Sequence, residues 1–318
     1  MEPKSVYACY YPNEELRLKS SSGAIISAVA EYVFSKNGSV YGVVFSEDCY
    51  SASFKKATNM EEFSKIRGSK YVQAKIGNTF AEVKRDLQSG NLVLFTGTVC
   101  QVSGLKKFLR KEYENLICID VICHGVPSPK LWKEYLQYQE KKYNHKIENV
   151  NFRCKKNGWV QYGLLENDKF FNRENDPYML MFLRNYSLRP SCYACKTKNE
   201  NMSDITVGDF WGINNVLEDF DDDKGCSILL VRTELGSSIF DLLKDKLFYK
   251  EVQYKQSIQY NPAEFESSMR PNGRDNFFND MNSKTFDELI KLYAVPNKVP
   301  FKRKLKGFVK KLVKGSVR

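Results

Sequence analysis

Nine cysteines are the residues of this chain whose type and spacing most directly suggest chemistry. Cys192 and Cys195 are separated by two residues, a spacing that lets a single turn present both sulfurs to one metal. A structural zinc site, a thiol/disulfide redox pair and half of an iron–sulfur site all use it. The cysteine number is odd, and in a reducing compartment we expect thiols or thiolate ligands instead of disulfides.

Two further cysteines follow predicted strands. Cys100 comes after the apolar run 91–97 and stands at the start of a predicted helix, whose N-terminus would favour its thiolate. Cys123 closes the apolar run 115–123, directly before His124. Functional groups of α/β sheets lie just beyond the carboxyl ends of strands, so both cysteines are candidate ligands. We expect the other five cysteines, which lack ligand spacing, to pack in the interior.

Two residues are candidate catalytic groups that supply a proton. His124, one of two histidines, adjoins Cys123, and packing in the core is the alternative for it. Asp209 ends an alternating, strand-like segment shortly after the cysteine pair. We expect Asp209 to emerge near the cysteines, and a turn cap is the alternative.

Two polar turns precede predicted helices, at residues 20–23 and 96–98. Backbone N–H groups and hydroxyls in such turns can hold phosphate, although the same composition also caps helices that bind nothing. Two such turns in one chain favour a nucleotide or flavin phosphate. Residues 67–71, which include Lys70, could add a cation and an aromatic surface, or form a solvated turn.

Strand-like and helical patterns alternate through the first half of the chain. The predicted helices cover 24–37, 59–68, 78–90, 98–113 and 128–144, and the predicted strands 39–46, 91–97 and 115–123. This order predicts an α/β fold with a mixed or parallel sheet and flanking helices. After residue 145 the pattern loosens into a smaller, irregular, cysteine-bearing region, followed by one more strand and helix at 226–246.

The basic excess of the chain is concentrated at its C-terminus. Lys and Arg number 49 against 38 Asp and Glu, a net charge of +11, but residues 297–318 alone hold nine basic and no acidic residues. The body is therefore nearly neutral, which argues against nucleic-acid binding. Residues 301–313 place apolar side chains on one helical face with lysines opposite, as in helices that lie on anionic membranes. A solvated extension, or a helix docked on its own domain, is the alternative.

No window reaches the roughly eighteen consecutive apolar residues of a spanning helix. The N-terminus lacks the apolar core of a signal peptide. We therefore expect a cytoplasmic protein, with the basic tail as a means of peripheral contact with the inner membrane surface.

Six ordered blocks together resemble the coenzyme F-420 hydrogenase/dehydrogenase beta-subunit family. The blocks are RLKSSSGA (17–24), IRGSKYVQA (66–74), FTGTVCQVSGLKKFL (95–109), ICIDVICHGVPSPKLWKEYL (117–136), LRPSCYACK (188–196) and SDITVGDFWGI (203–213). The resemblance implies an iron–sulfur flavoprotein oxidoreductase that passes electrons between a 4Fe-4S cluster, FAD and a substrate.

The resemblance also implies roles for individual residues. The family pattern makes Cys100, Cys123, Cys192 and Cys195 the ligands of one cluster. The segments expected to line the flavin or its phosphates hold Lys19, Ser21, Ser22, Gly23, Lys70, Thr96, Gly97 and Thr98. Val99 replaces the usual proline before the first cysteine, and Ala24 replaces the second glycine of the serine–glycine block. These departures bear on loop geometry and leave the sulfurs in place.

The resemblance divides the chain into three regions. Residues 1–90 form an N-terminal family region with the flavin-side loops, residues 91–250 a second region with the cluster cysteines, and residues 251–318 an extension with the basic tail. The ferredoxin-type cysteine run with which many family members begin does not occur in this sequence. Either a separate ferredoxin-like protein donates or accepts the electrons, or the fold has been kept without its electron-transfer role.

Bacterial relatives of this kind are associated with surface-polysaccharide synthesis, which implies a small-molecule or sugar-linked substrate. A second hypothesis comes from another class of protein. In it the same four cysteines hold structural zinc in a non-catalytic scaffold protein with a membrane-surface tail.

Overall fold

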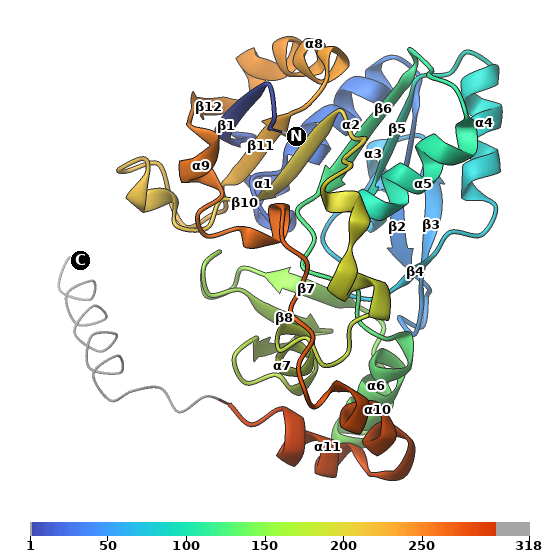
Figure 1. Cartoon of the computed structure of the whole chain (residues 1–318), viewed down its shortest axis with the longest axis vertical. Coiled ribbons are helices and arrows are strands. Elements are labelled where there is room, and N and C mark those ends of the chain that lie inside the picture. Colours follow the sequence, from blue (N-terminus) through green and yellow to red (C-terminus); the bar gives the residue numbers. More distant parts are fainter. Residues whose placement is uncertain (1, 297–318) are drawn as a thin grey trace.

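A central mixed sheet with helices on both faces organises the computed structural model, which describes residues 2–296 (Figure 1). The nine strands lie in the order β12-β1-β11-β10-β6-β5-β2-β3-β4, and a second sheet has the order β7-β8-β9. The predicted α/β fold with a mixed sheet and flanking helices is confirmed. The predicted basic tail, residues 297–318, lies outside the described residues.

The elements have the following bounds. The strands are β1 (Ser5–Tyr10), β2 (Ser39–Phe45), β3 (Ala52–Ala57), β4 (Ala74–Lys75), β5 (Val93–Thr98), β6 (Leu116–Val121), β7 (Val150–Cys154), β8 (Gly163–Glu166), β9 (Lys169–Asn172), β10 (Ile205–Asp209), β11 (Ser227–Val231) and β12 (Phe248–Glu251). The α-helices are α1 (Glu14–Lys19), α2 (Ile25–Ser35), α3 (Met60–Ile66), α4 (Thr79–Gln88), α5 (Val99–Leu109), α6 (Pro129–Tyr143), α7 (Pro177–Leu183), α8 (Glu234–Leu243), α9 (Tyr254–Ser257), α10 (Arg274–Ser283) and α11 (Phe286–Tyr293). The 3-10 helices are η1 (Pro190–Ala194), η2 (Lys196–Lys198), η3 (Ile213–Asn215), η4 (Lys244–Lys246) and η5 (Pro262–Glu264).

The middle of the large sheet is parallel. Strand β6 pairs in parallel with β10 on one side and with β5 on the other, and β5 pairs in parallel with β2. Strands β11, β1 and β12 continue the sheet in antiparallel pairs beyond β10. The carboxyl ends of β10, β6, β5 and β2 therefore meet at one edge, where α/β folds place their binding sites.

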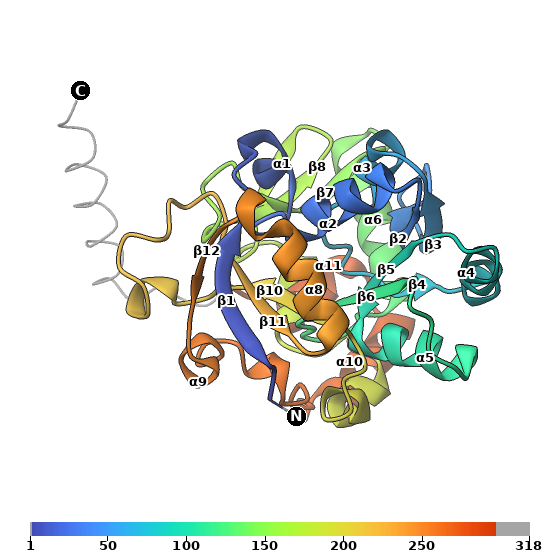
Figure 2. The ribbon, with the colours of Figure 1, turned by 90° about the horizontal axis from the view of Figure 1, so that it is seen from above.

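The central strands are buried on both faces, which explains why they read as continuous apolar runs. Leu94 and Ile117 pack under α2, whereas their neighbours Phe95 and Cys118 pack under α5. The view from above shows α2 and α5 on opposite sides of β5 and β6 (Figure 2). Helix α5 begins directly after β5, and α2 begins after the polar turn at residues 20–23, so the two helices position the two polar turns.

A second core lies below the large sheet in Figure 1, where α6, α7, α10 and α11 pack with the small sheet. Trp132, Phe152 and Tyr178 are fully buried at its centre. The Trp132 Nε1–H donates to the carbonyl of Cys49 (2.8 Å), which satisfies the one polar group of the ring. None of the helices between residues 2 and 296 is long and apolar enough to cross a membrane.

Candidate functional site at the carboxyl edge of the sheet

Strand register brings three predicted site residues to the same edge. Thr98 of β5 and Val207 of β10 both pair with Val121 of β6, so the three strands are level there. Two residues beyond these positions the chain reaches Cys100, Cys123 and Asp209. The parallel pairing of adjacent strands thus explains why residues more than one hundred positions apart lie together.

Hydrogen bonds between backbone N–H groups and side chains hold the Cys192–Cys195 turn in place. It spans η1, where the N–H of Val126 donates to the Cys192 Sγ (3.4 Å). The N–H of Cys195 donates to the Ser267 Oγ (2.9 Å). All four candidate cysteines are free thiols.

The candidate thiols influence one another's pKa values. Burial raises the pKa of Cys123 to about 12, and the neighbouring Cys100 and Cys192 contribute to this shift. Burial also raises the pKa of Cys192, with contributions from Cys100 and Cys195. Within residues 2–296, no group of three or more His, Cys, Asp or Glu side chains is arranged to hold a metal ion.

Three of the four sulfurs have polar neighbours. Besides the Val126 N–H at Cys192, the Thr98 hydroxyl lies 3.2 Å from the Cys100 Sγ, and the Thr197 hydroxyl 3.3 Å from the Cys195 Sγ. Hydrogen bonds to sulfur stabilise thiolates and set the reduction potentials of iron–sulfur centres. Cys100 is the exposed member of the set, and the other three are partly buried.

A cavity of about 480 Å³ opens beside the cysteines. Cys123, His124 and Asp209 line it. Most of the residues predicted to contact a cofactor line the same cavity, namely Ser21, Ser22, Lys70, Thr96, Gly97 and Thr98. The structure therefore brings both polar turns to one space, next to one of the predicted cluster ligands.

Two predicted cofactor residues lie outside the lining of this cavity. Lys19 is exposed, and its ammonium forms an ion pair with Glu15 (2.6 Å). Gly23 donates its N–H to the Ser227 Oγ (2.9 Å), and a Cβ at this position would lie 2.6 Å from the carbonyl oxygen of Cys9. The close approach to β1 and β11 accounts for glycine at position 23 by packing alone.

The departure from the family pattern at Ala24 has a geometric meaning. Ala24 has φ 64° and ψ 23°, the left-handed conformation that glycine adopts without steric cost. The backbone turn before α2 is thus formed by alanine, at the position where family members have their second glycine.

Lys70 stabilises the segment 67–71 of the cavity wall through hydrogen bonds to backbone carbonyls. Its ammonium donates to the carbonyls of Lys65 (2.8 Å), Ile66 (2.7 Å) and Arg67 (3.0 Å) at the end of α3. Burial lowers the pKa of Lys70 to about 7. The same segment contacts the serine turn at residues 20–23, because the Ser69 N–H donates to the Ser21 Oγ (2.8 Å).

Arg153, which the sequence did not single out, forms a wall of the cavity with Asp209. Two guanidinium nitrogens contact the two carboxylate oxygens at 2.5 and 2.7 Å, and the Trp159 Nε1–H donates to the same carboxylate (3.0 Å). Burial alone would lower the pKa of Arg153, but the Asp209 carboxylate together with Tyr71 and Tyr162 outweighs burial and raises the pKa well above its usual value. Asp209 is therefore held as the partner of a buried cation.

Aromatic rings surround this pair. The guanidinium carbon of Arg153 lies 3.9 Å from the ring centre of Tyr162, and the Tyr71 hydroxyl lies 3.3 Å from Arg153. Trp211 and Phe182 also line the cavity. A sequence signal for this wall existed in the aromatic pair after Asp209, but nothing in the pattern of β7 marked its arginine.

His124 is fixed between two neighbours in the cavity wall. Its Nε2 lies 2.6 Å from the Asn185 Oδ1, and its ring meets the Phe182 ring edge to face at 5.3 Å. Burial lowers the pKa of His124 from its usual value. The neutral imidazole is therefore favoured at this position.

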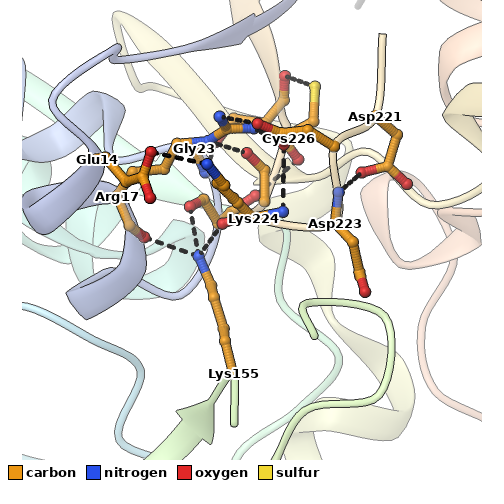
Figure 3. Close-up of polar contacts among 12 residues, drawn as sticks. Glu14, Arg17, Gly23, Lys155, Asp221, Asp223, Lys224 and Cys226 are labelled. Atoms are coloured by element: carbon orange, nitrogen blue, oxygen red, sulfur yellow. Dashed lines mark hydrogen bonds and ion pairs between the residues drawn. The ribbon is translucent and has the colours of Figure 1, made fainter. Parts of the chain in front are cut away.

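The serine turn at residues 20–23 is anchored from below by Lys155, which follows β7 (Figure 3). The Lys155 ammonium donates to the backbone carbonyls of Arg17 (2.8 Å), Ser22 (2.9 Å) and Lys224 (2.7 Å). These carbonyls come from two segments about two hundred residues apart in the chain. Lys155 thus joins the predicted phosphate turn to the loop before β11.

Arg17 completes this anchor from the other side of the turn (Figure 3). Its Nε donates to the Gly225 carbonyl (2.7 Å), and its two terminal nitrogens contact Asp222 at 2.8 and 2.5 Å. The guanidinium also lies 3.7 Å from the ring centre of Tyr10. Arg17 and Lys155 therefore both hold the serine turn against the loop before β11.

We expect Lys155→Met to lower the free energy of unfolding by about 2 kcal/mol, because three partly buried carbonyls lose their donor. Lys156→Met is the matched control, since the Lys156 side chain is exposed. Urea denaturation of the two variants measures the difference. Equal stabilities would show that Lys155 does not hold the turn.

Comparisons with known proteins give the family and the fold of the chain. Two sequence models of the coenzyme F420 hydrogenase/dehydrogenase beta subunit match the chain, the N-terminal model over residues 6–79 and the C-terminal model over residues 90–257. No curated protein matches the chain. A chain of the F420-reducing [NiFe] hydrogenase complex from Methanosarcina barkeri, solved in a xenon derivatization study, has a TM-score of 0.58 and 15% identity, over 92% of this chain and 91% of that chain. The chain thus belongs to the coenzyme F420 hydrogenase/dehydrogenase beta-subunit family of oxidoreductase subunits, as the six sequence blocks predicted.

Proposed function

We propose that this chain is an iron–sulfur flavoprotein oxidoreductase that passes electrons between a 4Fe-4S cluster, FAD and a substrate. The observation that carries the proposal is the cavity of about 480 Å³, which joins both predicted phosphate turns to Cys123 and His124. A cluster exchanges single electrons and a flavin exchanges either single electrons or hydride, so the two groups together connect one-electron and two-electron chemistry.

The four cysteines supply the ligand types of an iron–sulfur centre, although residues 2–296 hold no preformed group of three metal-binding side chains. Cys100, Cys123, Cys192 and Cys195 supply four thiols, the donor set of a 4Fe-4S cluster. The positive charge of Lys198 lowers the pKa of Cys123, in opposition to burial. Its ammonium also donates to the Cys123 carbonyl (2.8 Å). A cation and sulfur-directed hydrogen bonds are the features that stabilise thiolate ligands.

Two kinds of lining residue support the proposal that the cavity binds a flavin. The serine and threonine turns offer hydroxyls and backbone N–H groups, and the half-buried Arg67 adds a guanidinium that would bind phosphate oxygens. Tyr71, Phe182 and Trp211 offer apolar faces suited to a planar ring. We propose that the polar turns hold the phosphates and the aromatic side chains bound the ring system.

His124 is the side chain that we propose to hold the proton that accompanies hydride transfer. Asn185 presents its Oδ1 to the His124 Nε2, so the neutral ring carries its hydrogen on Nε2 and leaves Nδ1 as the acceptor. Asp209, the second predicted proton donor, contacts Arg153 through both oxygens. Asp209 is therefore better suited to fix the cavity wall than to exchange protons.

The proposed partners follow from the same chemistry. A ferredoxin-like protein would donate or accept single electrons, and a small-molecule or sugar-linked metabolite, in surface-polysaccharide synthesis, would exchange hydride at the cavity. We propose a cytoplasmic location for these reactions.

Metal, sulfide and flavin analysis of protein purified without oxygen tests this function. We expect a brown protein with about four irons, about four sulfides and one FAD per chain. A colourless protein with one zinc and no flavin would contradict the proposal and favour the zinc-stabilised scaffold.

A further inference from the structure

Exposure of Cys100 opens the cysteine site to the protein surface. Cys100 lies in the first turn of α5 and is exposed, whereas the other three candidate ligands are partly buried. Lys107 lies seven residues further along α5, on the same side of the helix, with 64% of its side chain exposed. A cation therefore stands two turns from the exposed thiol.

Further cations come from the segment that carries the other two cysteines. Arg189 and Lys196 are exposed and flank Cys192 and Cys195 in the sequence. Arg189 is the N-cap residue of η1, the 3-10 helix that contains Cys192. Helix η2, which begins with Lys196, packs against α5. We call the surface formed by Lys107, Arg189 and Lys196 the basic face.

Two exposed apolar side chains lie on a segment that contacts the cysteine site. Met269 is 80% exposed and Phe265 is 45% exposed. Their segment is attached to the cysteine site, because Ser267 accepts from the Cys195 N–H and Ser268 donates to the His124 carbonyl. Exposed apolar groups beside charged ones are typical of protein interfaces.

Acidic residues on these segments are fewer than the cations. Glu200 forms an exposed ion pair with Lys107 (3.9 Å), and Glu266 is exposed beside Ser267. Lys198 adds a fourth cation, which is partly buried and donates to the Cys123 carbonyl. Positive charge thus predominates around the exposed sulfur, although the body of the chain is nearly neutral.

We infer that the basic face, with Met269 and Phe265, is the docking surface for an acidic protein that carries single electrons. The inference rests on the proposed function, since it needs a redox centre on the four cysteines. Opposite charges on two proteins steer their encounter and raise the association rate, and electron-transfer contacts are small and transient. In each encounter the reduced carrier loses one electron and the cysteine centre gains it, and no bond forms or breaks. Two encounters supply the two electrons of one hydride.

The test compares two charge-reversed proteins, both purified without oxygen and loaded with iron, sulfide and FAD. The first is the double variant Lys107→Glu with Lys196→Glu, which inverts two cations of the basic face. The control is Lys55→Glu with Lys246→Glu, which makes the same change in net charge at two exposed lysines on β3 and η4. Stopped-flow absorbance follows flavin reduction by a reduced acidic ferredoxin, and by dithionite as a small reductant that needs no docking.

We expect the ferredoxin rate of the wild type to fall as ionic strength rises. At low salt the basic-face variant should react about tenfold more slowly than the control variant, and the two should converge at high salt. Their rates with dithionite should agree. These results would support docking at the basic face.

Other results overturn the inference. Equal ferredoxin rates in the two variants, with a wild type that dithionite reduces, would refute the docking surface and leave the proposed function standing. A wild type that holds no iron or flavin would refute both. A wild-type dimer that only the basic-face variant converts to monomer, with unchanged ferredoxin rates, would show that this face joins two copies of the chain instead.

Discussion

The Cys192→Ser variant should lose most of its iron and slow electron transfer by about a hundredfold or more, while it keeps its flavin. A serine hydroxyl is a far poorer ligand for iron in a cluster than a thiolate. The Cys192 sulfur accepts the Val126 N–H, and its charge interacts with those of Cys100 and Cys195, so its replacement should remove a member of the set directly. The flavin should remain because Cys192 does not line the cavity.

Cys49→Ala provides the matched control. Cys49 is a buried cysteine of the second core, 3% exposed and remote in sequence from the four candidate ligands. This variant should keep its iron and flavin, with a small loss of stability from the vacated volume. Iron and sulfide analysis with the flavin absorbance measures both proteins. Full iron content in Cys192→Ser, or an equal loss of iron in Cys49→Ala, would contradict the assignment of the ligands.

The position of Cys100 and Cys123 at one edge of the sheet could be predicted because strand order follows local pattern. The apolar runs that became β5 and β6 were continuous, each was followed by a helix, and such units pair in parallel. Cys100 and Cys123 therefore had to lie at one edge of the sheet. The Cys192–Cys195 turn could be added only from the family resemblance, because no periodicity connects that irregular segment to the sheet.

Two basic residues that support the cavity wall, Arg153 and Lys155, could not be predicted from the sequence. Arg153 and Lys155 lie in and just after a short strand of the small sheet, where a basic residue is typical of a solvated face. Their burial comes from contacts with β10 and with the loop before β11, which are distant along the chain. Lys19 is the opposite case, because the family pattern predicts a contact with the cofactor, whereas its ammonium forms an exposed ion pair with Glu15.

The Arg153→Met variant should lose about 3 to 5 kcal/mol of its free energy of unfolding. The side chains of Arg153 and Asp209 are only 4% and 14% exposed, so removal of the guanidinium leaves a carboxylate with little access to water. The Trp159 Nε1–H is the contact that the carboxylate then retains. Urea denaturation of the protein without cofactors measures the loss.

Two further variants separate the buried charge from simple loss of packing. Arg270→Met removes a cation from an exposed pair with Asp275, whose side chains are 52% and 68% exposed, and should cost less than about 1 kcal/mol. Adding Asp209→Asn to Arg153→Met removes the stranded charge and keeps an oxygen for the Trp159 Nε1–H. The double variant should therefore be more stable than Arg153→Met alone by at least about 1 kcal/mol. A double variant that is no more stable would mean that packing, and not charge, explains the loss. Recovery of stability would instead show that the unpaired Asp209 carboxylate explains the cost of removing Arg153.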